Sequence, residues 1–294
     1  MQVHNRLLEQ YPEFRIRLGR LEHRTRERLS QPAAFRAAPQ IITIPVVVHV
    51  VYRTAQQNIV KAQIDSQIAA LNRDYSAGNP DGNAVPAAWA GLVTNTNVQF
   101  ALATRDPAGH PTDGVTRTHT QHASFDTLDA VKSNARGGAN AWPRDRYLNL
   151  WVCNLSGGVL GYAQFPGGPA ATDGVVITYT AFGTSGTAAA PFNMGRTATH
   201  EVGHWLNLRH IWGDTEDCTG NDFVDDTPNA QHPNFGRPTF PHVSCGNGPN
   251  GDMFMNYMDY VDDAGMVMFT AGQVVRMHAA LDGARSALVT AATS

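Results

Sequence analysis

The chain has 294 residues, a formal net charge of −3 and a pI near 6.4. Its length and its hydrophobic content of 42% suit one large domain or two lobes around a substantial core. No basic stripe is available to neutralise phosphates, which argues against nucleic acid as a partner, and no apolar run is long enough for a membrane span.

The first 30 residues are charged, rich in arginine and helical in their period. Their apolar residues include Leu7, Leu8, Tyr11, Phe14, Ile16, Leu18 and Leu21. Taken alone, this pattern predicts a solvated amphipathic helix that packs on the domain. It lacks the apolar core of a signal peptide. Residues 30–40 contain two prolines and predict a linker that is open to cleavage.

From residue 41 onward the pattern is that of an α/β protein. We expect strands at 41–52, 98–104, 147–153 and 157–165, the last of them rich in glycine. We expect helices at 61–75, near 127–135, at about 191–206 and at 271–288. The predicted fold class is therefore α/β (α+β), with strands and helices in one domain.

The chain contains, from His200 on, the run His-Glu-Val-Gly-His-Trp-Leu-Asn-Leu-Arg-His. His200 and His204 are four residues apart, so on a helix both imidazoles can reach one metal ion. Glu201 points to the side of that face, where a carboxylate can take a proton from a water at the metal. His210 can be a third ligand if the helix ends near Asn207 and the chain turns back. Three neutral histidines leave one position of a tetrahedral Zn²⁺ open, as catalytic zinc sites require.

Two histidines at this spacing also occur on ordinary helix faces, either solvated or bonded to a partner. The third histidine argues against that alternative. So does an apolar side that would anchor the helix in a core, formed by Thr197, Ala198, Val202, Trp205 and Leu206.

A second motif follows about fifty residues later: from Met255 the chain reads Met-Asn-Tyr-Met-Asp-Tyr. With the zinc motif and an acidic loop that contains a cysteine, it closely resembles the pappalysin family of the metzincin clan, in particular the cytophagalysin/ulilysin-like branch. The resemblance is distinctive over about 190–275 and looser from about 41 to the zinc helix. It implies a zinc-dependent endopeptidase that cleaves extended peptides, with Glu201 as the general base.

The resemblance also implies the domain organisation. Residues 1–40 would be a pro-segment-like helical extension and linker, and residues 41–294 a metzincin catalytic domain. Its upper lobe, about 41–207, would hold a mixed twisted sheet, a backing helix and the zinc helix, and its lower lobe, about 208–294, would be irregular. No cysteine precedes Cys153, so we expect no cysteine switch of the kind that family pro-segments carry.

The resemblance assigns roles to three further residues. Met258 would form the Met-turn, an apolar floor beneath the metal. Tyr260 would swing between the metal and the developing oxyanion. Alone, such a stretch would be core packing, because methionine fills irregular gaps. The clan has glycine where this chain has Asn207, and we expect asparagine to be tolerated because it readily adopts a left-handed conformation.

Six carboxylates lie between Gly213 and Thr227. They repel one another unless a cation joins them, and oxygen-rich loops of this kind suit calcium. A solvated acidic loop is the ordinary alternative. Family members carry calcium here, so the resemblance implies one Ca²⁺ or more that stiffens the loop, with ligands from Asp222, Asp226, Thr227 and the carbonyl of Val224.

The chain has three cysteines. The family pattern implies a disulfide between Cys218 and Cys245, which on the chain-entropy model contributes roughly 3–4 kcal/mol. A disulfide indicates an oxidising compartment, so we expect a secreted enzyme whose signal peptide is not visible here, with an unprocessed cytosolic protein as the alternative. Cys153 lies in a predicted apolar strand, where a small buried side chain fits better than a zinc-blocking switch.

In metzincins, an edge strand ahead of the zinc helix pairs with the extended substrate. We expect this role for Gly158, Val159, Leu160 and Gly161, where the glycines permit close backbone approach. Relatives that cleave before Arg or Lys place an acid after the Met-turn, and by our alignment its position falls at or near Met266. We therefore expect an apolar S1′ pocket, with protein or peptide substrates and a monomeric enzyme.

Two rival functions belong to other classes. A catalytically silent binding protein with this fold would need a broken site, yet the three histidines and Glu201 are present. A structural zinc protein would fill the fourth coordination position with Cys or His. Neither residue type occurs close to the motif, and Cys218 is better used in a disulfide.

Overall fold

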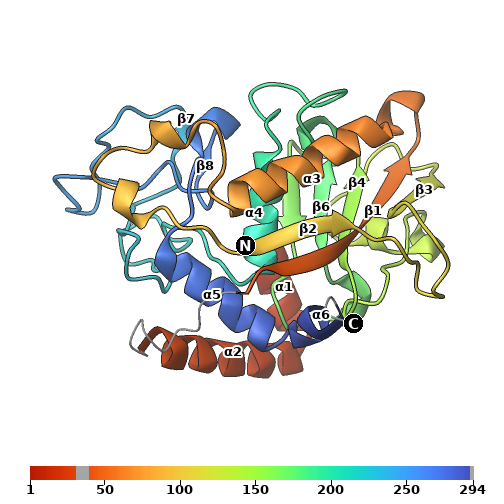
Figure 1. Cartoon of the computed structure of the whole chain (residues 1–294), viewed down its shortest axis with the longest axis horizontal. Helices are drawn as coiled ribbons and strands as arrows, with labels where there is room; N and C mark the ends of the chain where they lie inside the picture. Colours follow the sequence, from red (N-terminus) through yellow and green to blue (C-terminus); the bar gives the residue numbers. More distant parts are fainter. Residues whose placement is uncertain (31–39, 292–294) are drawn as a thin grey trace.

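The computed structural model describes residues 1–30 and 40–291, so most of the predicted linker lies outside the described residues. One mixed sheet has the strand order β2-β1-β4-β6-β5, and β3 also pairs with β1 (Figure 1). The strands are β1 (Ile42–Tyr52), β2 (Val98–Leu102), β3 (Val115–His119), β4 (Leu148–Cys153), β5 (Gly161–Ala163) and β6 (Val175–Thr178). Every pair is parallel except β5 with β6. β5 is thus an antiparallel edge strand.

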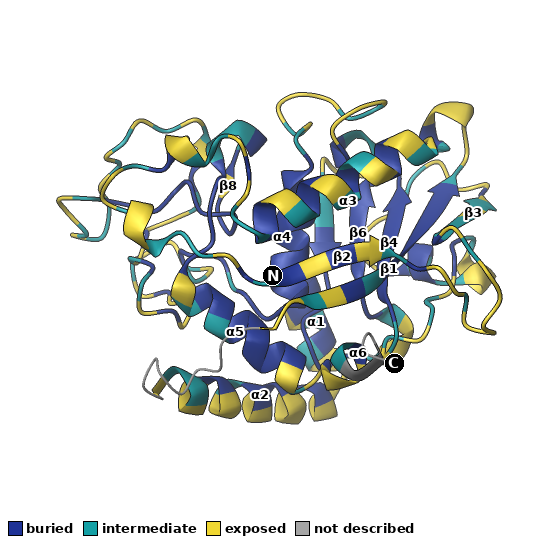
Figure 2. Ribbon diagram, in the orientation of Figure 1, coloured by how far each residue is buried: buried dark blue, intermediate teal, exposed yellow. Residues whose placement is uncertain are grey.

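The central strands are buried on both faces, as Figure 2 shows. β1 carries five valines flanking His49, all of them buried, and every residue of β4 and β6 is buried. Parallel strands covered on both faces read as continuous apolar runs rather than as alternating ones. This is why the sequence pattern predicted β1 and β4 correctly.

Helices cover the sheet and carry the zinc motif (Figure 1). They are α1 (Gln2–Gln10), α2 (Pro12–Ser30), α3 (Lys61–Tyr75), α4 (Arg196–Trp205), α5 (Ala271–Asp282) and α6 (Ser286–Ala291). α3 packs against β2 and α4, and α4 packs against β5 and β6. The predicted mixed α/β class is confirmed, with a backing helix (α3) and a helix that bears the zinc motif (α4).

The segment between α4 and α5 is mostly turns and loops. Its regular structure is a short parallel pair of strands, β7 (Phe235–Gly236) and β8 (Tyr260–Val261), together with one 3₁₀ turn at Asp263–Gly265. The division into an upper and a lower lobe stays a prediction. Among the described residues, no helix is both long and apolar enough to cross a membrane.

The N-terminal helices pack on the domain through one apolar side. α2 begins at Pro12, a residue suited to the first turn because its missing N–H has no partner there in any case. α2 lies along α5, and its outer side is exposed (Figures 1 and 2). The buried apolar residues of the two helices are Val3, Leu7, Phe14, Leu18 and Leu21.

Three predicted helices differ from those observed. The helix near 127–135 is wrong: the structure has two single 3₁₀ turns, and left-handed residues bracket them, Asp129 with φ +62° and Gly137 with φ +79°. The zinc helix begins at Arg196 instead of about 191, directly after Gly195 with φ +81°. The C-terminal helix breaks near Gly283 into α5 and α6.

The strand predicted at 157–165 is only three residues long. Gly157 and Gly158 have φ values of +69° and +73°, which a strand cannot accommodate. Gly158 and Val159 therefore lie in the turn before the edge strand, and Gly161 lies within it. Strands β3 and β6 were not predicted from the pattern.

Candidate metal centre and active site

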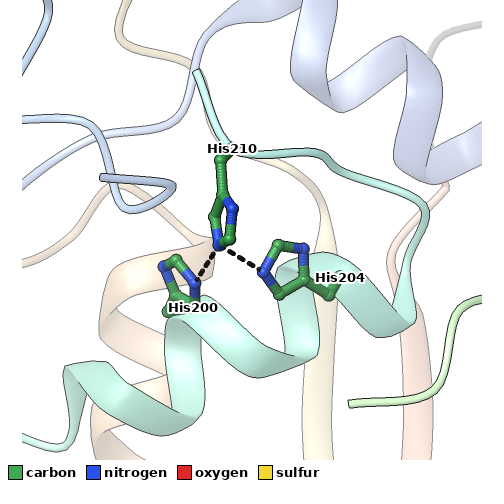
Figure 3. A group of neighbouring side chains, drawn as sticks. All are labelled: His200, His204 and His210. Carbon is green, nitrogen blue, oxygen red and sulfur yellow. Dashed lines mark hydrogen bonds between the residues drawn. The ribbon is translucent and has the colours of Figure 1, made fainter. Parts of the chain in front are cut away.

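Three imidazoles converge where the zinc motif leaves its helix (Figure 3). His200 and His204 lie one turn apart on α4. The chain then turns at Asn207, which has φ +77°, and returns with His210. The Nε2 atom of His210 lies 3.3 Å from that of His200 and 3.0 Å from that of His204. The three side chains are buried.

The opposite ring nitrogens show which tautomer each histidine has. The Nδ1 atoms face acceptors: the carbonyl oxygens of Tyr257 (2.7 Å) and Leu208 (2.8 Å), and a carboxylate oxygen of Asp214 (2.6 Å). Because these oxygens only accept, each Nδ1 donates its proton, and the three Nε2 lone pairs meet at one point. Lone pairs this close repel one another unless a cation lies between them.

The pKa values of the three histidines also favour the neutral imidazole. Burial lowers the pKa of His200 to about 4, and it lowers the pKa values of His204 and His210 well below their usual range. The rings are therefore neutral near pH 7 and act as donors to a metal. Three neutral imidazole nitrogens fit a Zn²⁺ ion that keeps one position for a water or a substrate.

Met258 is fully buried and packs against α4 at Gly203, between His200 and His204 in the sequence. A Cβ atom on Gly203 would stand 2.5 Å from the Met258 Sδ atom, so α4 needs a glycine there to admit the methionine. The amide of Met258 donates to the Asn256 side chain, which holds the turn. Sequence reasoning missed Gly203, although an isolated glycine inside a helical pattern signals close packing.

Glu201 is buried beside the edge strand. A Cβ atom on Gly161 would lie 2.9 Å from the Glu201 Cγ atom, so the backbone of β5 passes close to this side chain. Burial raises the pKa of Glu201 to about 8. A carboxylate whose pKa is near neutral can accept and return a proton at physiological pH.

Tyr260 is 40% exposed and stands next to the imidazoles. Its ring centroid lies 4.7 Å from that of His210 and 5.5 Å from that of His200. Burial raises the pKa of its hydroxyl above the ordinary value, so the group stays protonated and can donate a hydrogen bond.

Two cavities open beside Glu201. One has a volume of about 330 Å³, and its largely apolar lining includes Leu160, Phe192, Phe235 and Met266. The other, of about 470 Å³, is lined on one side by the first residues of α1, among them His4, and on the other by residues that include Glu201 and Tyr260. The N-terminal segment therefore borders the cleft.

The predicted calcium ligands have protein partners. Asp222 accepts hydrogen bonds from the amide of Val224 and from the hydroxyl of Thr227, which closes a turn. Asp226 accepts from the Thr270 hydroxyl and from an amide at the start of α5. Burial raises the pKa of Asp222 to about 7. Calcium at this turn stays a prediction.

Cys218 and Cys245 form a disulfide with a Cα–Cα distance of 5.4 Å. Cys153 is a buried free cysteine in β4, and burial raises the pKa of its thiol. A thiol that stays protonated is a poor nucleophile and a poor metal ligand, which agrees with a packing role.

Comparisons with known proteins agree on one family. The family model Peptidase_M43, described as pregnancy-associated plasma protein-A, matches residues 132–282. An extracellular metalloprotease of Pyricularia oryzae is 34% identical over 252 residues, which cover 82% of this chain and 75% of the relative. One from Arthroderma benhamiae is 32% identical over 257 residues, covering 85% and 81%.

Solved structures give the same result. Mature mirolysin of Tannerella forsythia in complex with a cleaved peptide has a TM-score of 0.85 and 51% identity, covering 87% of this chain and 98% of mirolysin. A promirolysin mutant from the same organism has a TM-score of 0.89 and 46% identity, covering 99% of this chain and 96% of promirolysin. The chain belongs to the pappalysin (Peptidase_M43) family, and it is an extracellular metalloendopeptidase.

Proposed function

We propose that His200, His204 and His210 hold a catalytic Zn²⁺ ion and that Glu201 is the general base of peptide-bond hydrolysis. The observation that carries this proposal is the convergence of three Nε2 lone pairs, each fixed by an acceptor at its own Nδ1. When bound, zinc supplies Lewis-acid polarisation of the scissile carbonyl and lowers the pKa of the attacking water.

The other residues around the centre would bind the peptide, transfer the proton and stabilise the oxyanion. The free edge of β5 pairs with the extended peptide and places its scissile bond above Glu201. Glu201 accepts a proton from the attacking water and later donates it to the leaving amine. Tyr260 donates a hydrogen bond to the oxyanion, a contribution typically of about 3 kcal/mol per donor. Met258 packs beneath the histidines and limits their movement.

Replacement of the base tests this assignment. Glu201→Ala should keep stoichiometric zinc, because the three imidazoles are untouched, but once the N-terminal segment has been released its casein cleavage should be at the level of the blank, unlike that of the wild type treated in the same way. Metal analysis and a caseinolysis assay measure the two properties separately. Asp145→Ala is the control, because it removes an exposed carboxylate that is distant from Glu201 in the sequence. Caseinolysis by Glu201→Ala well above the blank would remove Glu201 from the mechanism.

For the substrate, we propose an apolar side chain at P1′. The cavity of about 330 Å³ beside Glu201 has the size of a side-chain pocket, and Met266 is one of several apolar residues in its lining. Burying an apolar side chain there stabilises the complex by about 25 cal/mol per Å².

For the N-terminal region, we propose that residues 1–40 are a pro-segment and that residues 41–294 are the catalytic domain. α1 borders the cleft, and a promirolysin aligns with nearly the whole chain. The described part of this segment contains no cysteine, so contacts other than a thiolate on the metal must hold it.

We also propose a structural Ca²⁺ ion at the turn formed by Asp222, Val224 and Thr227, with Asp226 beside it. The support is chemical: a buried carboxylate with a raised pKa, in a loop with six acidic residues, gains from a cation. The ion would stiffen the loop beside the cleft and take no part in the chemistry. We further expect the enzyme to act as a monomer.

A further inference from the structure

We propose that Asp214 is a positioning residue that orients His210 toward the metal and increases its strength as a ligand. This inference rests on the proposed role of His210 as the third ligand. The Asp214 Oδ1 atom lies 2.6 Å from the His210 Nδ1 atom. The other two ligand candidates differ, because their Nδ1 atoms donate to neutral backbone carbonyl groups. Among the three, only His210 donates to a carboxylate.

His210 needs such a partner because of where it lies. His200 and His204 project from α4, whose backbone hydrogen bonds fix their directions. His210 follows the helix in an irregular stretch, so its ring orientation depends on side-chain contacts. Outside the histidine cluster, three are present: the Trp212 ring stacks on the imidazole with centroids 4.2 Å apart and an angle of 7°, the Tyr260 ring meets it edge to face at 4.7 Å, and Asp214 bonds its Nδ1 atom.

The backbone explains how Asp214 reaches back to a residue four positions earlier. The Gly213 amide donates to the His210 carbonyl, which closes a turn. Gly213 and Asp214 then have φ values of +67° and +62°, so the chain curls back over the imidazole. A Cβ atom on Gly213 would lie only 2.0 Å from the Asn221 amide nitrogen, so this position must be glycine. The turn that presents Asp214 is therefore built into the loop.

The chemical consequence follows from the hydrogen bond. A carboxylate acceptor fixes the Nδ1–H tautomer, so the Nε2 lone pair is always directed at the metal, and its negative charge makes the imidazole a better donor. Partners of this kind typically change metal affinity by about 10- to 100-fold. One carboxylate of the acidic loop would thus serve the zinc centre, separately from any calcium ion.

The test measures zinc binding directly, by competition with a chromophoric chelator. We expect Asp214→Ala to weaken zinc binding by about 10- to 100-fold and to release zinc faster. Asp214→Asn keeps an acceptor oxygen without the charge and should fall between Asp214→Ala and the wild type. Glu216→Gln, an exposed carboxylate of the same loop, is the matched control and should bind zinc as the wild type does.

Two further measurements separate the possible causes. With Co²⁺ in place of zinc, the visible spectrum of Asp214→Ala should shift, because one imidazole is held differently, while the melting temperature of the metal-free protein should stay within a few degrees. If Asp214→Ala does not fold, Asp214→Asn decides. Zinc affinity and a cobalt spectrum equal to those of the wild type would overturn the inference.

A third variant, His210→Ala, shows whether a negative result with Asp214→Ala overturns only the positioning role of Asp214 or the proposed function as well. If His210→Ala loses zinc while Asp214→Ala does not, His210 is a ligand and only the positioning role is wrong. If neither variant loses zinc, the ligand set itself is wrong.

Discussion

Two of the three histidines of the candidate metal centre are fixed by α4, and the position of the third depends on the loop that follows. His200 and His204 are placed by helical geometry, and their spacing alone predicts that they share a face. The approach of His210 depends on a left-handed residue, and asparagine, the substitute for the family glycine, has φ +77° at position 207. The contact of Asp214 depends on positive φ values at Gly213 and Asp214; the glycine marks a turn, but no pattern shows that the turn directs Asp214 to His210, so the contact could not be predicted from the sequence.

Substrate preference is decided by single residues of the pocket. We expect peptides with Leu, Met or Phe at P1′ to be cleaved at least about tenfold faster than those with charged residues, because the lining near Met266 is apolar. Cleavage of a proteome-derived peptide library, with and without chelator, measures this. Met266→Ala should enlarge the pocket and shift the preference toward larger apolar side chains.

A library dominated by P1′ Arg or Lys would contradict the apolar pocket. Asp263 would then be the carboxylate to substitute first. It is buried three residues before Met266, it accepts hydrogen bonds from the Met194 and Arg196 amides, and its Oδ1 atom has no hydrogen-bond partner.

Among the helices and strands, long elements with a clear apolar pattern were predicted from the sequence, and short or polar elements were not. β1 and α3 agree with their predicted bounds to within one residue. β3 reads Val-Thr-Arg-Thr-His and is partly exposed, so its own sequence pattern does not indicate a strand. It forms one because its backbone pairs with that of β1. The segment near 127–135 has helical composition, but left-handed residues on either side limit it to single turns.

α2 is joined to α5 by an ion pair beside the turn at Asn207. Glu22 bonds both terminal nitrogens of Arg276, at 3.1 and 2.8 Å, and also contacts the Asn207 side chain. Arg276 is fully buried in α5, so removal of Glu22 leaves an uncompensated charge, at a cost of about 3–5 kcal/mol.

We therefore expect the segment to stay bound after the linker is cut. With a cleavage site engineered into residues 31–39, the N-terminal peptide should co-elute with the catalytic domain and keep caseinolysis low. Glu22→Ala should weaken its binding by at least about 100-fold and release activity. Glu27→Gln, an exposed carboxylate of the same helix, is the control. If the Glu22→Ala peptide is retained as tightly as the wild-type peptide, the ion pair does not hold the segment.

The acidic loop gives a second prediction at this scale. Calcium added to protein from which that ion has been removed by a calcium-selective chelator should raise the melting temperature by about 4 °C or more. Asp222→Asn should abolish that rise, because it removes a buried carboxylate, and zinc content should not change. A melting temperature that does not respond to calcium would leave the loop as an ordinary hydrogen-bonded turn, held by Asp222 and Thr227.

For the whole molecule, the stability of the folded state should depend on pH through histidines buried in neutral form. His49, in the middle of β1, accepts at Nδ1 from the Thr116 hydroxyl and donates from Nε2 to the Asn149 side chain. Both nitrogens have partners that suit a neutral ring, and burial lowers the pKa of His49 to about 4.

The sign follows from linkage. The unfolded chain has a histidine pKa of about 6.5, so between pH 6.5 and 4 it binds a proton that the folded protein does not. The contribution of His49 is fully present above pH 6.5 and is lost as the pH falls, by about 3 kcal/mol at pH 4. Asp222 and Asp259 act in the opposite direction, because burial raises their pKa values to about 7.

His49 and the two aspartates change the free energy of unfolding in opposite directions as the pH falls. The prediction therefore concerns the difference between the wild type and His49→Gln. In urea unfolding at a series of pH values, the free energy of unfolding of the wild type should fall between pH 7 and 4 by about 3 kcal/mol more than that of His49→Gln. The metal centre and the carboxylates are the same in both proteins, so their titration cancels in the comparison. Parallel curves for the two proteins would show that His49 becomes protonated without cost in the sheet, and would contradict the prediction.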